Sequence, residues 1–447
     1  MSDKKLITHE YIEYHNKYSK LYNKSIVLMM VGSFLELYQV KNDTIVEGPD
    51  LQYLCNNILY TQLTRKNKTI QEISYSNPLM AGIPSFSSDK YIDILIKHNY
   101  TVIIIDQKDD PNPLKKNKIR YEKEIISPST YINFESENNN QINNYLMVIY
   151  CEYIKKRDGS TFLTFHISMC DTLTGVINVL QIINDDIKVL FDDFYRIMMF
   201  YNPKELIIFG NTGNINISKY FDVLINKNII FYNNINNYNN EFHKPSYQNA
   251  ILEKVYTGYK QQFLSIPEYL NLEKYPEIIL SLCYLLDFLY KHNEKLIINL
   301  NKPLFINDIE NNKRNLTLVN NCIQNLNIVS SNPSDLSLFK LLNNCKTPMG
   351  IRYLQFKLLH PITNETILHN YYESTSLFIE NNETIKKIRN DLVMINDIEK
   401  LNRKMKITKL HPYELLYIYK SLSLMNLLKS DLITSKDLKF SKVHLLF

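Results

Sequence analysis

The stretch "LMMVGSFLELY", residues 28–38, places an aromatic ring and a carboxylate two positions apart within an apolar segment. Alternate residues of an extended chain share a face, so Phe34 and Glu36 point to the same side of a strand. The leucines at positions 35 and 37 face the other side. An exposed aromatic ring can stack on a flat partner, and a carboxylate accepts hydrogen bonds. Taken singly, a Phe in such a segment is more often a core residue, and a Glu more often lies on a solvated face.

Two further groups of side chains have types that bind anions. Arg65, Lys66 and Lys68 form a basic cluster that can contact phosphate groups, and such contacts make affinity depend on salt. The segment from Ser85 to Ser88 opens a predicted helix, whose free amides can bind phosphate, so Ser85 and Ser87 are also candidates. The ordinary alternatives are a solvated loop for the basic cluster and a helix cap for the serines.

The sequence lacks the spacings that nucleotide hydrolysis and structural metal sites require. A phosphate-binding loop, G-x-x-x-x-G-K-[ST], needs two glycines five positions apart, and no two of the nine glycines have that spacing. None of the six cysteines forms a C-x-x-C pair, which fits a reducing compartment. We therefore expect no ATP hydrolysis by this chain alone, and no cofactor or metal in it.

The composition is typical of a globular protein. At 447 residues the chain is long enough for about two to four domains. A net charge of +5 permits a nucleic-acid partner without requiring one. The N-terminal residues "MSDKKLITHEYIEYH" contain no apolar signal region, and no segment has the length of a transmembrane helix. We expect a soluble intracellular protein, with nucleus, cytoplasm and viral replication compartment left open.

Hydrophobic periodicity divides the chain into three parts. Residues 1–132 alternate helix and strand patterns, and the polar stretch 133–144, "NFESENNNQINN", is a linker. Residues 145–262 combine a three-stranded meander with later helix and strand patterns, which predicts a second α/β domain. Residues 263–447 form the third part. From about Leu270 onward this part carries apolar residues at helical spacing, which predicts an all-α region. The elements predicted most clearly are a helix at 9–22, one strand at 26–40, a helix at 89–97, strands at 101–106 and 205–210, and a helix at 185–200.

Several motifs, taken in order, resemble those of the MutS family of DNA mismatch repair proteins. "GSFLELY" is similar to the family's Gly-x-Phe-x-Glu-x-aromatic motif, and "PLMAGIP" to its Pro-Met-Ala-Gly-Val/Ile-Pro motif. Further segments that resemble the family are "DQKDDP" (106–111), "IISPSTYI" (125–132), "HISMCDTLTGV" (166–176), "NNKRNLTL" (311–318), "CKTPMGIRYLQFKLLHPI" (345–362) and "INDIEKLNRKM" (395–405).

The resemblance implies a multidomain α/β plus α protein. Its parts are a mixed α/β mismatch-recognition domain, an RNase H-like α/β connector and an all-α core and lever region. It also implies that Phe34 stacks on a base as a wedge and kinks the duplex, which costs least where a pair is already weakened. Glu36 then contacts the base, either as an acceptor for a base N–H or as a protonated donor. Arg314, Arg352 and Arg403 lie in core and lever motifs, and we interpret them as structural ion-pair residues.

Three positions depart from the family pattern. Ser33 stands where an acidic or basic residue often precedes the Phe, and Leu35 stands where an aromatic residue is common. Ser129 occupies a position where Gly is usual. The first two departures leave Phe34 and Glu36 in place, so the implied recognition motif is intact.

The family's ATPase, with its ATP and Mg²⁺, is implied to lie in a domain that this sequence does not contain. The sequence stops within the expected lever region, at "SKVHLLF", and a fragment, one half of a split gene and a degraded copy all remain open. The expected partners are double-stranded DNA with mismatches or small loops, a partner chain that carries the ATPase, and a second copy, because the family forms dimers. No membrane partner is expected. The residue bias toward AT-rich codons also resembles the relatives carried by large DNA viruses.

Two alternative functions stay open at this stage. One is a non-catalytic scaffold or decoy that keeps the fold and binds protein partners through the connector. The other is a metal-dependent nuclease, because an RNase H-like fold can cluster carboxylates around metal ions. The sequence favours the nuclease least, because Asp171 is isolated on its turn and Asp192 and Asp193 lie in a helical segment.

Overall fold

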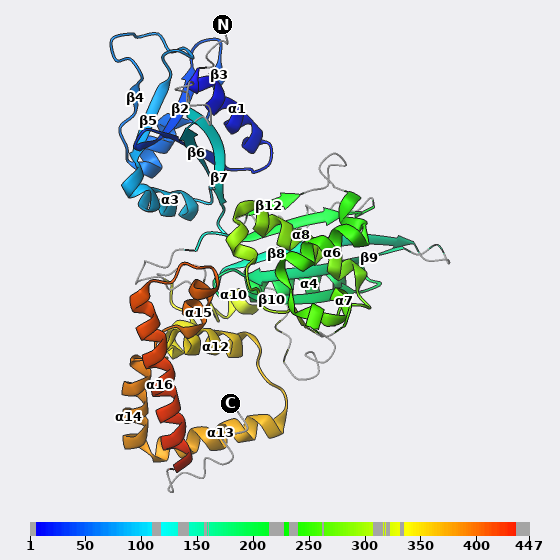
Figure 1. Ribbon diagram of the computed structural model, residues 1–447. Helices are drawn as coiled ribbons and strands as arrows, with labels where there is room; N and C mark the ends of the chain where they lie inside the picture. Colours follow the sequence, from blue (N-terminus) through cyan, green and yellow to red (C-terminus); the bar gives the residue numbers. More distant parts are fainter. Residues whose placement is uncertain are drawn as a thin grey trace.

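The computed structural model describes residues 6–109, 118–132, 143–155, 159, 161–213, 228–231, 240–261, 263–306, 316, 318, 322–330 and 335–434. Within these residues, Figure 1 shows three parts that follow one another along the chain. A sheet with helices near the N-terminus is followed by a second sheet covered by helices, and then by a helical part. Arg314, which we interpreted as an ion-pair residue, lies outside the described residues, as do most of the linker and the final 13 positions, 435–447.

The first sheet has seven strands in the order β4-β5-β2-β1-β6-β7, with β3 pairing to β2. It is a mixed sheet, because β1 runs antiparallel to β2 and parallel to β6. Helix α1 packs against β1 and β2, whereas α3 packs against β5 and β6. The elements are α1 (Ile7–Ser19), β1 (Ser25–Val31), β2 (Phe34–Lys41), β3 (Val46–Glu47), α2 (Leu51–Tyr53), η1 (Leu54–Leu59), β4 (Thr64–Arg65), β5 (Leu79–Pro84), η2 (Ser85–Ser87), α3 (Ser88–Lys97), β6 (Thr101–Asp109) and β7 (Lys118–Ile126).

The second sheet has six strands in the order β12-β11-β8-β9-β10-β13. It lies in the part of the chain where the resemblance implies a connector, and we call this sheet and the helices packed on it the connector. The meander β8-β9-β10 is antiparallel, while β11 pairs parallel to β8 and β12 parallel to β11. Successive residues of β8 pack on opposite faces: Leu146 and Val148 join one buried cluster, Met147 and Ile149 the other. Its strands are β8 (Tyr145–Lys155), β9 (Thr161–Asp171), β10 (Val176–Ile183), β11 (Glu205–Gly210), β12 (Asn228–Phe231) and β13 (Leu304–Phe305).

Helix α8 (Pro276–His292) packs against β8 and β9, although we expected an all-α region from about Leu270. Strand β13 also pairs with β10 beyond that point, so the second sheet extends past the expected start of the helical region. A helix that is apolar on all sides is a buried helix, and most of α8 is buried. The helical pattern was therefore right, but it did not show which part of the molecule the helix covers. The boundary at residues 262 and 263 stays a prediction.

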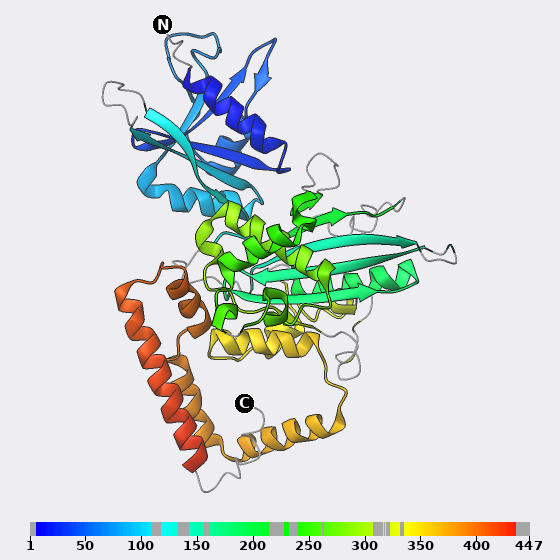
Figure 2. The same ribbon diagram turned by 45° about the vertical axis from the view of Figure 1, so that its right-hand side comes forward.

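Helices cover the rest of the second sheet and form the C-terminal part. In Figures 1 and 2, α14 and α16 lie side by side, and α13 lies away from the two sheets. None of the described helices combines the length and the apolar composition that crossing a membrane requires. The remaining elements are α4 (Ile187–Tyr201), η4 (Asn240–His243), α6 (Pro245–Val255), η5 (Gly258–Gln261), α7 (Ile266–Tyr269), η6 (Glu294–Ile297), α10 (Cys322–Asn325), α11 (Leu338–Leu342), α12 (Pro348–Leu359), α13 (Glu365–Glu380), α14 (Asn382–Val393), α15 (Ile398–Lys406) and α16 (Pro412–Thr434).

Candidate nucleic-acid interface

A tight turn interrupts the segment that we expected to be one strand from residue 26 to 40. Val31 pairs with Phe34, so only Gly32 and Ser33 lie in the turn between β1 and β2. Gly32 has a φ of 63°, and two-residue hairpin turns need a glycine or a similarly permissive residue at such a position. The single-strand prediction was therefore wrong, because it overlooked this glycine. The turn makes Phe34 the first residue of β2, at the end of the sheet.

The side chains of β2 alternate between the two faces as the sequence predicted. Leu35 and Leu37 are buried, whereas Phe34 is 45% exposed and Glu36 is half-buried. Tyr38, on the same face as Phe34 and Glu36, is only 2% exposed because α1 covers it. The alternative that Phe34 is a core residue does not hold, because nearly half of its surface reaches solvent.

Strand β5 contributes a glycine beside these two side chains. Gly82 pairs with Glu36, and a Cβ at Gly82 would lie 3.6 Å from the Cδ1 atom of Phe34. The Phe34 ring therefore leans across β5 at the position where this strand has no side chain. Glycines in strands often mark places where another group approaches closely. The surface next to Phe34 and Glu36 is left open on the β5 side.

Glu36 accepts a hydrogen bond from the hydroxyl group of Tyr38, two residues along the same strand. Burial raises the pKa of Tyr38, and the hydrogen bond to Glu36 and its charge raise it further. The phenol therefore keeps its proton and acts as the donor. The Tyr38 ring meets Tyr11 of α1 edge to face, with ring centroids 5.4 Å apart. Tyr38 was not a candidate in the sequence analysis, although its spacing of two from Glu36 on a strand was a usable signal.

The serine segment lies beside the same turn. The amide of Ser85 donates to the carbonyl oxygen of Ser33 at 3.0 Å, which fixes the start of η2 against the hairpin. The hydroxyl of Ser87 donates to the carbonyl oxygen of Pro84 at 3.1 Å, and it caps no amide of α3. Helix α3 begins at Ser88, as the cap signal indicated, but the expected side-chain cap is not formed. Phe86, which the sequence analysis did not single out, is 92% exposed here.

The basic cluster lies at the opposite end of β5. Arg65 pairs with Leu79, and its guanidinium donates to the carbonyl oxygen of Ile70 at 3.1 Å. Lys66 and Lys68 are exposed on the loop that follows β4. The buried amide of Asn77 donates to two carbonyl oxygens of this loop, those of residues 70 and 72, and so fixes its shape.

The two ends of β5 define the extent of this candidate interface. Leu79 pairs with Arg65 and Pro84 pairs with Phe34, so the two groups are separated by five strand residues. At about 3.4 Å per residue this separation is roughly 17 Å. The structure therefore brings Phe34, Glu36 and Ser85 together at one end of β5 and leaves Arg65, Lys66 and Lys68 near its other end.

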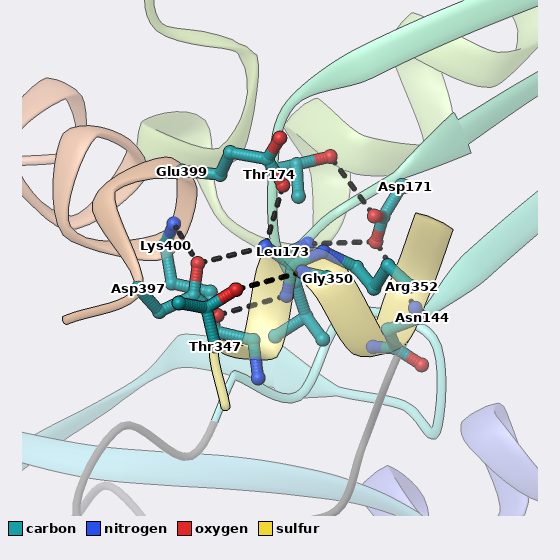
Figure 3. Close-up of polar contacts among 10 residues, drawn as sticks. All are labelled: Asn144, Asp171, Leu173, Thr174, Thr347, Gly350, Arg352, Asp397, Glu399 and Lys400. Carbon is teal, nitrogen blue, oxygen red and sulfur yellow. Dashed lines mark hydrogen bonds and ion pairs between the residues drawn. The ribbon is translucent and has the colours of Figure 1, made fainter. Parts of the chain in front are cut away.

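A second constellation lies where the connector meets the C-terminal helices (Figure 3). The carboxylate of Asp171 accepts hydrogen bonds from the amide of Asn144 at 3.0 Å and from the hydroxyl of Thr174 at 2.9 Å. Asn144, which we placed in the linker, is fully buried. Burial raises the pKa of Asp171, although its hydrogen bonds and the nearby charge of Arg352 act in the opposite direction.

Arg352 of α12 supplies the positive charge at this junction. It binds Asp397 through two hydrogen bonds, at 2.7 and 2.8 Å, and also bonds with Glu399. Burial alone would lower the pKa of Arg352, but its bonds with these two carboxylates hold that pKa above the ordinary value. The ion-pair interpretation is thus correct for Arg352. Arg403 differs, because its guanidinium donates to the carbonyl oxygens of residues 296 and 298.

The chain that leaves the first sheet is held against the connector by a buried carboxylate. Glu205, at the start of β11, accepts hydrogen bonds from the Ser127 hydroxyl at 2.5 Å and from the Ser129 amide at 3.0 Å, and another from the Ser129 hydroxyl. Burial raises the pKa of Glu205, and these three hydrogen bonds act against that effect. Ser129, the residue that departs from the resembled family's usual Gly, thus contributes its hydroxyl to this contact. Among the described residues, no group of three or more His, Cys, Asp or Glu side chains could hold a metal ion.

Comparisons with known proteins agree with the order of these parts. A family model described as MutS domain I matches residues 10–135, and one described as MutS domain III matches residues 314–445. A mutS homolog of Acanthamoeba polyphaga mimivirus is 29% identical over 435 residues, which cover 90% of this chain and 37% of the relative.

Bacterial relatives show the same extent of similarity. The DNA mismatch repair protein MutS of Caldanaerobacter subterraneus is 28% identical over 429 residues, which cover 95% of this chain and 44% of the relative. That of Borrelia garinii is 24% identical over 428 residues, which cover 92% of this chain and 42% of the relative. The chain thus spans about two fifths of the length of these curated relatives.

Proposed function

This chain belongs to the MutS family, and on that premise we propose that its first sheet binds mismatched or looped-out base pairs in double-stranded DNA. The observation that carries the proposal is the exposure of Phe34 at the end of the sheet, two residues from the half-buried Glu36. The ring enters the minor groove and stacks on a base, which unstacks one step at a cost of about a few kcal/mol. A mismatched pair has already lost part of that stacking and pairing energy, so it yields more easily than a correct pair.

In this proposal the other candidate residues have supporting roles. Glu36 meets the displaced base as a hydrogen-bond acceptor, or as a donor when protonated, and its charge repels the phosphates of intact duplex. Arg65, Lys66 and Lys68 lie about 17 Å away along β5 and contact the phosphate backbone. Ser85 and Ser87 stand at the start of η2 and α3, and in this proposal the N-terminal end of α3 faces a phosphate, while the Ser85 amide stays bonded to Ser33.

ATP hydrolysis and dimer formation, two further properties of the family, complete the proposal. The sequence contains no G-x-x-x-x-G-K-[ST] motif, so we infer that ATP hydrolysis, with its Mg²⁺, is supplied by polypeptide outside this sequence. A second copy of the chain is a further partner in this view, because the family forms dimers.

A binding assay tests the recognition step. The full chain is titrated with a duplex that contains a single mismatch and with the matched perfect duplex. Phe34→Ala should lower affinity for the mismatched duplex by about ten- to a hundredfold, because stacking on one base contributes about 1–3 kcal/mol. Affinity for the perfect duplex should change little, so the ratio of the two affinities should fall.

Phe263→Ala provides a matched control, because Phe263 is a fully exposed phenylalanine between η5 and α7, far along the chain from the first sheet. This variant should keep the affinity ratio of the unsubstituted protein. Equal affinity of the unsubstituted protein for both duplexes, unchanged by Phe34→Ala, would reject the recognition proposal and favour the scaffold alternative.

A further inference from the structure

Three consecutive residues of one strand face form a connected set. Phe34, Glu36 and Tyr38 all point toward the side of the sheet that α1 covers, and exposure falls along the series from Phe34 to Tyr38. Glu36 thus lies between the exposed ring of Phe34 and the buried phenol of Tyr38. The hydroxyl of Tyr38 donates to the Oε2 atom of Glu36.

Tyr38 is itself held in place by its surroundings. Its ring packs edge to face on Tyr11, with an angle of 77° between the ring planes. The hydroxyl of Tyr11 in turn donates to the carbonyl oxygen of Val27, a fully buried residue of β1, at 3.1 Å. A glutamate has a long flexible side chain, and ordering it on its own costs rotamer entropy. The Tyr38 hydroxyl, fixed by its packing on Tyr11, orders the Glu36 side chain before DNA binds, so this entropy cost is not incurred on binding.

We propose that Tyr38 is a positioning residue that holds the Glu36 carboxylate in the orientation needed to meet an unpaired base. The inference rests on the proposed mismatch binding and adds to it a residue that does not touch DNA. The hydroxyl occupies Oε2, and no other described residue bonds with Oε1, which is left for the base. Gly82 pairs with Glu36 across the sheet and contributes no side chain, so β5 presents only backbone beside the carboxylate, with the Phe34 ring leaning over it.

A double-mutant cycle on the affinity ratio between mismatched and perfect duplex tests this role. Tyr38→Phe removes only the hydroxyl and should lower the ratio by about three- to tenfold, the scale of one ordinary hydrogen bond. Glu36→Ala removes the acceptor of the Tyr38 hydroxyl and should lower the ratio as well. If Tyr38 acts through Glu36, adding Tyr38→Phe to Glu36→Ala should change the ratio by less than about twofold.

A fluorescent base analogue beside the mismatch separates positioning from a general loosening of the strand. 2-Aminopurine reports base unstacking, which in the proposed function is the work of Phe34. Tyr38→Phe should leave this unstacking signal at saturating protein unchanged, whereas distortion of β2 would reduce it together with the affinity ratio. Tyr256→Phe is the matched control, since Tyr256 is a buried tyrosine of the connector whose hydroxyl donates to the Asn301 carbonyl oxygen at 3.3 Å.

The outcomes are distinguishable. The positioning role is overturned if Tyr38→Phe keeps the ratio of the Tyr256→Phe control, if its full effect persists in the Glu36→Ala background, or if it reduces the unstacking signal. A failure of the proposed function looks different, because the unsubstituted protein would then show no preference for the mismatched duplex at all.

Discussion

At the scale of single residues, the exposure of Phe34 follows from its place in the chain. It is the first residue after a two-residue turn, so the sheet ends beside it, whereas Tyr38 lies farther along the same face and is covered by α1. The turn depends on Gly32, whose φ of 63° is strained for residues with a Cβ atom. The ring is therefore presented by a rigid element, and its exposure needs no rearrangement of the strand.

A buried histidine gives a prediction about pH. His292 of α8 donates from Nδ1 to the Phe288 carbonyl oxygen and accepts at Nε2 a hydrogen bond from the Tyr22 hydroxyl at 3.3 Å, so it joins the first part of the chain to the connector. Burial lowers the pKa of His292 to about 4. An unfolded histidine titrates near 6.5, so between these values the unfolded state binds the extra proton. The free energy of unfolding should be highest above about pH 6.5 and should fall by roughly 3 kcal/mol as pH drops toward 4 because of this group.

The measurement for this prediction is denaturant unfolding across that pH range. His292→Gln should flatten the fall in the free energy of unfolding between pH 6.5 and 4 relative to the unsubstituted protein. A residual slope remains, because burial also lowers the pKa of His166 to about 4. Parallel curves for the variant and the unsubstituted protein would contradict the assignment of this pH dependence to His292.

Residue types and spacing predicted part of this picture. Period-two alternation was enough to place Phe34 and Glu36 on one face, because strand geometry is local. The hydrogen bond from Tyr38 required knowledge of which helix covers that face, and α1 comes from a separate segment of the chain. Local pattern carries no information about that packing.

At the scale of elements, the loop after β4 should raise the affinity for DNA equally for mismatched and perfect duplexes. Lys66 and Lys68 are exposed on this loop, and the buried Asn77 amide holds its backbone. Replacing both lysines by glutamine should weaken binding to mismatched and perfect duplex by the same factor. Each phosphate contact contributes about −0.9 to the slope of log affinity against log salt, so the slope should become shallower by about 1.8.

Lys274→Gln with Lys295→Gln removes the same charge from exposed positions of the connector and serves as the control. It should leave the salt slope within about 0.3 of the unsubstituted value. If the loop variant changed the affinity ratio between the two duplexes, or kept the original slope, the loop would not be a phosphate contact.

Element boundaries were predictable where the signal was a local backbone requirement. Strand β11 and the start of α3 lie where the apolar run and the serine pair indicated. The role of the Ser87 hydroxyl was not predictable, because the hydroxyl can bond forward to α3 or back to Pro84, and the η2 turn selects the second. The placement of α8 on the connector sheet likewise depends on tertiary packing that periodicity does not encode.

At the scale of the whole molecule, buried polar contacts link the three parts. Glu205 of the connector holds Ser127 and Ser129, which follow the first sheet. The side-chain amide of Asn144 donates to the Ser129 carbonyl oxygen at 2.8 Å, and the backbone N–H of Asn144 donates to the Asp171 carboxylate. The positive charge of Arg352 on α12 in turn favours the ionised form of Asp171. The chain of contacts runs from the first sheet to the C-terminal helices.

Four of the segments that resemble the family meet along this path. They are separate in sequence, at 125–132, 166–176, 345–362 and 395–405, and each motif was visible locally. Their convergence was not predictable from spacing, because contacts between such distant segments are set by the packing of whole parts. The departure at Ser129 acquires a structural reason only here, where its hydroxyl bonds with Glu205.

The ion pair of Arg352 should therefore control how firmly the helices are attached to the connector. Arg352→Met removes the charge and keeps much of the volume, and it leaves the largely buried carboxylate of Asp397 without its partner. Breaking such a pair should cost roughly 2–4 kcal/mol, measured as faster amide hydrogen exchange in α12 and α15. Lys97→Met, which breaks an exposed pair with Asp93 one helical turn away, should cost less than about 0.5 kcal/mol. Adding Asp397→Asn to Arg352→Met should restore part of the protection, because the unpaired charge is then gone. Equal exchange in the Arg352 and Lys97 variants would show that the junction is held by apolar packing instead.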